Sequence, residues 1–214
     1  MTKGRAGEYA WKPVIIEEVV REQREQLLGL QDVTKKKSCI GDRNRKRDSF
    51  VYWLDAGICV TTKCSQKNPF SADVMFARKN GLYTPKSSGS LRKWTVPGMA
   101  EKLNLTQKVY QSNHASMASA NIMLVDVHND FVYDNVIVPW KDCALEEDCI
   151  APPGSSRKNH RQDQSALSVL LAKNSIPVPG GTGSVIRGYI ESKKDTARHQ
   201  RFKDMCAYPN ATFA

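Results

Sequence analysis

The chain has 214 residues, which is enough for one domain of ordinary size with a tail. Hydrophobic residues make up 40% and charged residues 25%, so the composition is compatible with a packed core. The formal net charge of +10 favours anionic partners such as nucleic acid, phosphorylated ligands, acidic glycans or membrane headgroups. No apolar run approaches the roughly 20 residues of a spanning helix, and residues 1–8 lack the apolar part of a secretory signal. We therefore expect no transmembrane segment, and a complete chain of this sequence would be cytoplasmic.

The first predicted element is a helix from Pro13 to about Leu30, because apolar residues recur there at spacings of three and four. A basic loop follows at 35–48. It is most simply a solvated connection, and the alternative is a nuclear-localisation or nucleic-acid patch. Nucleic acid is the less favoured partner, since no helix-turn-helix, zinc-finger or RNA-binding signature accompanies the loop. Residues 50–54, which are aromatic and branched, then predict a strand that ends at Asp55.

The rest of the chain mixes further helices and strands. Residues 63–95 are rich in Lys, Ser, Asn and Gly and predict loop with short strands. A short helix is expected at 97–105, a buried strand at 121–127 and a helix at 161–173. This mixture predicts an α/β layered domain at 1–176, followed by a partly ordered tail at 177–214. Open α/β sheets bind ligands beyond the carboxyl ends of their strands, and Asp55 lies at such an end.

The six cysteines include two closely spaced pairs, Cys59–Cys64 and Cys143–Cys149, that are candidates for local disulfides. Free thiols are the alternative in a reducing compartment, and the lack of any Cys-x-x-Cys pair argues against a structural zinc site. Asn104 and Asn210 each begin an Asn-x-Thr acceptor for N-glycosylation, should the chain enter the secretory pathway.

Asp55 is the first candidate site residue. Its carboxylate follows a hydrophobic strand and precedes the small residues Ala56 and Gly57, which would let a ligand approach the backbone. Mg²⁺ and Mn²⁺ bind oxygen ligands, often one or two carboxylates together with substrate phosphates. The alternative is an acid that only ends a turn.

The start of the helix at 161–173 carries the other candidates. Asp163 and Gln164 could hydrogen-bond the hydroxyls of a sugar or align a nucleophile, and Arg161 or His160 could face a diphosphate. The simpler alternative is that Asp163 stabilises the positive end of the helix dipole and that His160 is structural or solvated.

Four motifs in this order resemble one family: Tyr-Ala-Trp-Lys-Pro at 9–13, Val-Tyr-Trp-Leu-Asp-Ala-Gly at 51–57, Trp-x-x-Cys-Ala-Leu at 140–145 with Cys-Ile-Ala-Pro at 149–152, and His-Arg-x-Asp-Gln-Ser-Ala-Leu at 160–167. They are similar to eukaryotic nucleotide-diphospho-sugar transferase-like proteins over residues 9–173. The resemblance implies a GT-A-like, Rossmann-type fold with a mixed, mostly parallel sheet. It also implies a nucleotide-sugar donor, Mn²⁺ or Mg²⁺, and residence in the Golgi or secretory lumen.

By position, the resemblance places Asp55 at the metal and diphosphate, and Asp163 as the catalytic acid on the acceptor side. Two departures affect the expected site. Gly57 stands where the usual metal motif has its second acid, and the first nucleotide-binding strands expected before Tyr9 are absent, so the expected fold is incomplete.

The sequence therefore predicts an enzyme that transfers a sugar from a nucleotide-sugar donor to a hydroxyl of a glycan or protein acceptor. The alternative is a non-catalytic or truncated α/β scaffold that binds anionic glycan or nucleic acid through its basic surface.

Overall fold

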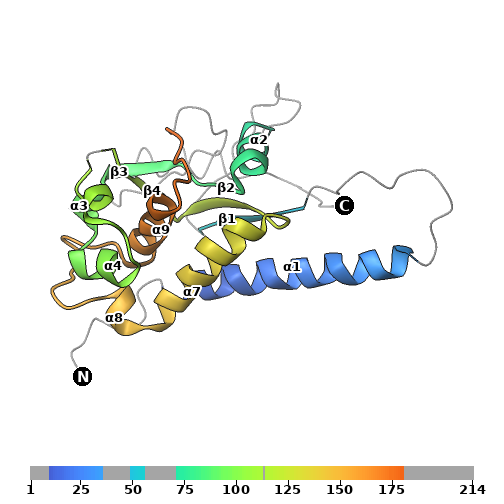
Figure 1. Ribbon diagram of the computed structural model, residues 1–214, viewed down its shortest axis with the longest axis horizontal. Coiled ribbons are helices and arrows are strands. Elements are labelled where there is room, and N and C mark those ends of the chain that lie inside the picture. Colours follow the sequence, from blue (N-terminus) through green and yellow to red (C-terminus); the bar gives the residue numbers. More distant parts are fainter. Residues whose placement is uncertain (1–9, 36–48, 56–70, 113, 181–214) are drawn as a thin grey trace, which may run out of the picture.

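The computed structural model describes residues 10–35, 49–55, 71–112 and 114–180 of the chain (Figure 1). Several predicted features lie outside these residues, namely the basic loop at 36–48, the Cys59–Cys64 pair, the acceptor at Asn210 and the tail beyond 180.

The helices are α1 (Trp11–Lys35), α2 (Ser71–Asn80), α3 (Leu91–Trp94), α4 (Pro97–Lys102), α5 (Gln107–Tyr110), α6 (Asp130–Val132), the π-helix η1 (Tyr133–Ile137), α7 (Val138–Leu145), α8 (Glu147–Ile150) and α9 (Gln162–Lys173). The strands are β1 (Phe50–Leu54), β2 (Leu82–Tyr83), β3 (Lys86–Ser90), β4 (Ser116–Ala118) and β5 (Ile122–Asp126). The predictions of α1, β1, α4, β5 and α9 are confirmed within a few residues at their ends. For 63–95, the short strands expected there are present as β2 and β3, whereas the prediction of loop is wrong where α2 and α3 form.

The described strands make two small sheets. The first has three strands in the order β1-β5-β2, and the second pairs β3 with β4. All three pairings are antiparallel, with Val51 opposite Val125 and Leu82 also opposite Val125. The mixed α/β class is therefore correct, whereas the expected mostly parallel sheet finds no support in the described part of the chain.

Alternate residues of the three-stranded sheet face opposite sides, as the pleat of a strand requires. One face joins the main core together with residues of α1 and α7, through Val51, Trp53, Leu82, Met123 and Val125. The other face packs with α2 in a smaller cluster, through Phe50, Tyr52, Leu54, Tyr83, Ile122 and Leu124. The sheet is thus covered by helices on both faces.

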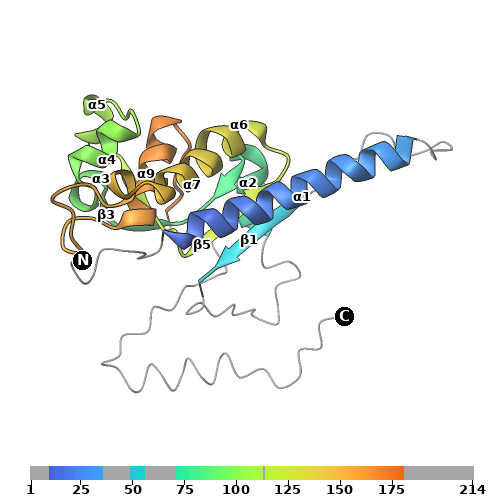
Figure 2. The same ribbon diagram turned by 90° about the horizontal axis from the view of Figure 1, so that it is seen from below.

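Helix α1 runs alongside the sheet, and its C-terminal half extends beyond the rest of the described fold (Figures 1 and 2). Polar contacts accompany the burial of Ile16 and Val20 in the first half of α1. The Tyr133 hydroxyl donates to Glu17 Oε1 at 2.7 Å, and the Arg24 guanidinium lies 4.5 Å from the centre of the Tyr133 ring. Arg24 Nη1 also donates to the Val127 carbonyl at 2.7 Å. These contacts fix α1 against η1 and so hold its N-terminal turn in place.

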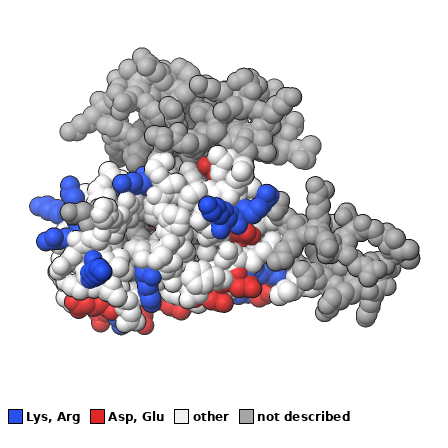
Figure 3. Space-filling view, turned by 45° about the horizontal axis from the view of Figure 1, so that its top comes forward, with Lys and Arg blue, Asp and Glu red and all other residues white. Residues whose placement is uncertain are grey.

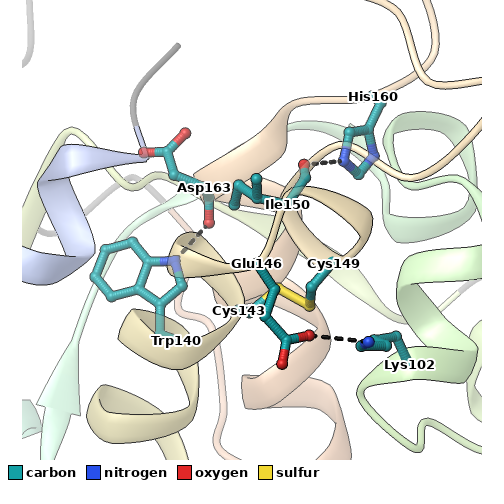
Figure 4. The surroundings of a disulfide bond; sticks show 8 residues. All are labelled: Lys102, Trp140, Cys143, Glu146, Cys149, Ile150, His160 and Asp163. Carbon is teal, nitrogen blue, oxygen red and sulfur yellow. Dashed lines mark hydrogen bonds and ion pairs between the residues drawn. A yellow bond between two sulfur atoms is a disulfide. The ribbon is translucent and has the colours of Figure 1, made fainter. Parts of the chain in front are cut away.

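A disulfide joins Cys143 of α7 to Cys149 of α8, with an S–S distance of 2.02 Å (Figure 4). The prediction of this pairing is confirmed. Lys102 of α4 forms an ion pair with Glu146 at 2.9 Å beside the same turn. The disulfide therefore closes the turn between α7 and α8 where it meets α4.

None of the helices within the described ranges combines the length and the apolar character needed to cross a bilayer.

Candidate functional site

Strand β1 carries Asp55 to the face of the sheet that α1 covers. Val51 and Trp53 face that side, so the alternation of the strand directs residue 55 the same way. The Asp55 N–H donates to the Asn121 carbonyl at 3.0 Å, which continues the pairing with β5 by one residue. Trp53 Nε1 donates to Asp55 Oδ1 at 2.8 Å. The carboxylate is therefore held in one orientation by its own strand.

Helix α9 places Asp163 at its first turn. Trp140, fully buried in α7, donates from Nε1 to the backbone carbonyl of Asp163 at 2.8 Å (Figure 4). Further along the helix, Gln164 Nε2 donates to the Ala118 carbonyl at 2.6 Å, and Ser168 Oγ accepts from the Ala118 N–H at 2.9 Å. The start of α9 is thereby fixed against α7 and β4, and the Asp163 carboxylate points towards the first turn of α1 in Figure 4.

Lys12, in the first turn of α1, lies between the two acids. Its Nζ is 3.0 Å from Asp55 Oδ2 and 3.3 Å from Asp163 Oδ2. It also donates to the Ala120 carbonyl at 3.3 Å. The structure therefore joins the two acids predicted from the sequence, although they belong to distant segments, and it adds a lysine that the prediction missed.

The sequence contained an indication that Lys12 is paired with an anion. The N-terminus of a helix carries partial positive charge, so a lysine in the first turn is unfavourable unless negative groups compensate it. Lys12 is followed directly by Pro13, a residue typical of the first helical turn. A buried anion near this lysine was thus a reasonable expectation.

The cluster is electrostatically asymmetric. The pKa of Asp163 is raised to about 6, because burial disfavours its charged form. Lys12 and the backbone N–H of Gln164 oppose this shift, and the charge of Asp55 adds to it. Asp163 Oδ2 is buried and has no well-directed hydrogen bond from the described residues. Its contact with Lys12 at 3.3 Å is therefore a charge interaction more than a directed hydrogen bond.

Solvent reaches the three side chains unequally. The Asp55 side chain is 30% exposed, whereas those of Lys12 and Asp163 are 4% and 6% exposed. Asp55 is consequently the member that a ligand can meet directly, and Lys12 and Asp163 lie behind it.

The Mn²⁺ or Mg²⁺ that the resemblance implies at Asp55 does not fit this arrangement. Each Asp55 oxygen accepts one hydrogen bond, from Trp53 or from Lys12, so the carboxylate is already oriented towards a cation. The ammonium also occupies the position between the carboxylates where a shared cation would lie. Within the described residues, no group of three His, Cys, Asp or Glu side chains is placed to hold a metal ion. We therefore assign no chemical step to a metal.

Arg161, two residues before Asp163, stacks on an indole. Its guanidinium carbon lies 3.9 Å from the centre of the Trp94 ring, and Nη1 donates to Ser87 Oγ at 3.1 Å and to the Ser88 carbonyl at 3.4 Å. Lys93 Nζ lies 5.2 Å from the same ring centre. Among the described residues, the guanidinium contacts hydroxyl and carbonyl oxygens and no carboxylate, and burial lowers its pKa. Arg161 therefore presents a positive charge that no acid neutralises within this part of the structure.

His160, predicted to bind substrate, is buried, and its ring points away from the Asp163 carboxylate in Figure 4. Its Nε2 lies 3.0 Å from the Ile150 carbonyl, and its Nδ1 lies 3.4 Å from the Val96 N–H, which donates to it (Figure 4). Burial lowers its pKa, and the neutral ring with its proton on Nε2 satisfies both contacts. His160 thus joins α8 to the residues before α4. Gln164, the other predicted contact, is half-buried and directs its amide to β4.

Comparison of the chain with family models, with curated proteins and with solved structures finds no match.

Proposed function

We propose that this chain is a glycosyltransferase-like protein, which transfers a sugar from a nucleotide-sugar donor to a hydroxyl of a glycan or protein acceptor. The observation that carries the proposal is the convergence of Asp55 and Asp163 on the buried Lys12. Buried charges are costly unless they are paired. A cluster of two acids and one lysine therefore adds little to the stability of the fold, which favours a functional role. Such clusters with a shifted pKa are frequent at functional sites.

In this proposal Asp55 is the catalytic residue, because it is the exposed member of the cluster. As the acceptor oxygen forms its bond to C1 of the donor sugar, the hydroxyl proton passes to Asp55. The bond between C1 and the diphosphate oxygen breaks, and the nucleoside diphosphate leaves with the electron pair. This assignment differs from the expected one, in which Asp163 was catalytic and Asp55 held a metal.

Lys12 and Asp163 act as positioning residues. The Lys12 ammonium holds Asp55 Oδ2 at 3.0 Å, while Trp53 holds Oδ1, so the carboxylate cannot turn away from the acceptor. Asp163 in turn contacts the Lys12 ammonium at 3.3 Å from the buried side of the cluster. Prior orientation of reacting groups can supply several kcal/mol of a reaction barrier.

Arg161 is the proposed contact for the donor diphosphate. An arginine whose partners are neutral keeps its charge available, and a phosphate offers it two parallel hydrogen bonds. Residence in the Golgi or secretory lumen belongs to the same proposal. The disulfide between Cys143 and Cys149 supports an oxidising compartment.

The test is a screen of nucleotide-sugars by thermal shift and by release of nucleoside diphosphate, using the full chain. A bound donor should raise the melting temperature by mass action. Asp55→Asn should abolish release while the donor still binds. Asp148→Asn, which changes an exposed acid outside the cluster, serves as the matched control and should keep full release. Release that persists in folded Asp55→Asn would remove the catalytic assignment.

Divalent ions provide a second arm of the same screen. Because the described groups do not form a metal site, Mn²⁺ or Mg²⁺ alone should leave the melting temperature unchanged. A shift that requires both the ion and the donor would indicate that the diphosphate supplies most of the ligands.

A second candidate function is the binding of an anionic glycan without catalysis. It is favoured by the two cations, Arg161 and Lys93, that lie over Trp94. Figure 3 shows the described Lys and Arg side chains of its face in separate groups, with acidic side chains along the lower rim. Binding through such surface charges should weaken steeply with added salt.

A further inference from the structure

The turn between α4 and α5 exposes the side chain of Asn104 between two buried leucines. Leu103 and Leu105 are buried in the main core, whereas Asn104 between them is exposed. The Asn104 N–H donates to the Glu101 carbonyl at 2.9 Å, and the Leu105 N–H donates to the Ala100 carbonyl at 2.8 Å. The turn is therefore fixed by its backbone and its leucines, and the asparagine side chain plays no part in the core.

The backbone of Asn104 suits an asparagine. Its φ is +57°, in the left-handed region that Asn and Asp tolerate better than other residues with side chains. No hydrogen bond joins its amide group to the described residues. The amide nitrogen is consequently accessible.

Thr106, two residues on, completes an acceptor sequence. The central residue is Leu105 and not proline, so Asn104-Leu105-Thr106 meets the requirement for N-linked glycosylation. Thr106 is also exposed, and its hydroxyl caps α5 by accepting from the Val109 N–H at 3.4 Å. The motif thus lies at the surface on a turn between two short helices.

An independent observation indicates the compartment in which this modification occurs. The bond between Cys143 and Cys149 is buried and local, and such disulfides persist in the oxidising lumen of the secretory pathway. Glycan transfer to Asn-x-Thr acceptors takes place in that same lumen.

We propose that Asn104 carries an N-linked glycan. A bond forms between Asn104 Nδ2 and C1 of the first sugar, and the bond between that C1 and the diphosphate of a lipid-linked oligosaccharide breaks. The amide proton leaves with the diphosphate, so no oxidant or reductant takes part. The donor and its transferase belong to the host cell.

A glycan on Asn104 would lie away from Asp55 and Lys12. Helices α4 and α5 lie at one end of the described fold, whereas β1 and the start of α1 lie nearer its middle (Figure 2). The modification is measured by mass spectrometry and the proposed sugar transfer by release of nucleoside diphosphate, so neither result decides the other.

The test is production of the full chain in eukaryotic cells with a cleavable secretory signal, followed by peptide mass spectrometry after PNGase F in ¹⁸O-labelled water. The enzyme converts a glycosylated asparagine to labelled aspartate, so the readout separates Asn104 from Asn210. We expect the label at Asn104 in protein whose Cys143–Cys149 disulfide has formed.

Three variants make the result specific. Asn104→Asp removes the acceptor nitrogen and keeps a residue that tolerates φ of +57°. Thr106→Ser keeps both the acceptor sequence and the cap of α5 and should retain the label, whereas Thr106→Ala should lose it. Recovery of unlabelled Asn104 from folded, secreted, disulfide-bonded protein would overturn the proposal.

Discussion

Replacing Asp163 by asparagine tests the electrostatics of the cluster. The substitution keeps the size and shape of the side chain and removes one buried negative charge. Unlike most changes to a buried residue, it is expected to raise stability at neutral pH, because the cost of burying that charge disappears. Removing one partner of a buried ion pair is destabilising when the other charge is left unpaired, but Lys12 keeps its ion pair with Asp55 at 3.0 Å in this variant, so we expect the saved cost of burial to dominate.

The magnitude follows from the pKa of Asp163. A carboxyl whose pKa rises from 3.8 to about 6 on folding binds its proton more tightly in the native state. The free energy of unfolding therefore falls as pH rises through this range, and above it the loss is on the order of 3 kcal/mol. The amide in the Asp163→Asn variant does not titrate, so the variant escapes this loss. The variant and the original chain should have similar stability below pH 4 and differ most above pH 6.

The assay is urea unfolding followed by tryptophan fluorescence, since Trp140 is fully buried and the region around it reports on folding. Measurements from pH 4 to pH 8 give the difference in unfolding free energy between the variant and the original chain. Asp148→Asn again serves as the control, because that side chain is exposed and should show only a small difference at any pH.

The reasoning would be refuted by a difference that stays flat with pH, or by a variant that becomes the less stable protein above pH 6. The second result would mean that attraction to Lys12 outweighs burial and holds the pKa of Asp163 below its ordinary value. The same variant should also lose most sugar transfer, because Lys12 is no longer held from behind.

Three further perturbations test the fold and the site. Lys12→Met leaves the carboxylates without a cation and should lower the free energy of urea unfolding by about 3–5 kcal/mol at pH 8, and by less at pH 5; an equal loss at both pH values would contradict the ion-pair account. Gly89→Ala should cost about 2 kcal/mol in the same assay, since φ is +90° and the new Cβ would lie 2.4 Å from Trp94 Nε1; unchanged stability would show that the indole moves freely. Reduction of Cys143–Cys149 should lower stability by about 2 kcal/mol, as expected for a short loop, and a Cys143→Ser, Cys149→Ser double variant should be insensitive to reductant.

The elements that could be predicted are those with strong local signals. Strand β1 has five consecutive aromatic or branched residues, and α9 carries Leu167, Leu170 and Leu171 at helical spacing within a continuously buried stretch. The disulfide could be proposed because its two cysteines are only six positions apart in the sequence.

Helix α2 lacked such a signal. Among the residues of α2 whose burial is described, Ser71 excepted, only Asp73 and Ala77 are buried, so the helix shows no wide apolar face. The helix is stabilised by contacts of half-buried residues with β2 and β5, which propensity and periodicity do not report.

The relative direction of the strands also could not be predicted from local sequence patterns. Strand β5 lies between β1 and β2, and its antiparallel pairing depends on contacts between segments far apart in the chain. The resemblance supplied a parallel arrangement that the described strands do not have. For the site, Asp55 and Asp163 were found from their position at the ends of elements, whereas Lys12 was taken only as part of a motif.

The Lys12 cluster contains residues from α1, from the end of β1 and from α9, so it forms only when these distant segments have folded together. No fragment that ends before α9 can contain it, and each charged side chain is exposed to water until the three segments meet. Contacts across such long stretches of chain form late and slowly in folding. A chemical label or activity that depends on this cluster would therefore distinguish finished molecules from partly folded ones.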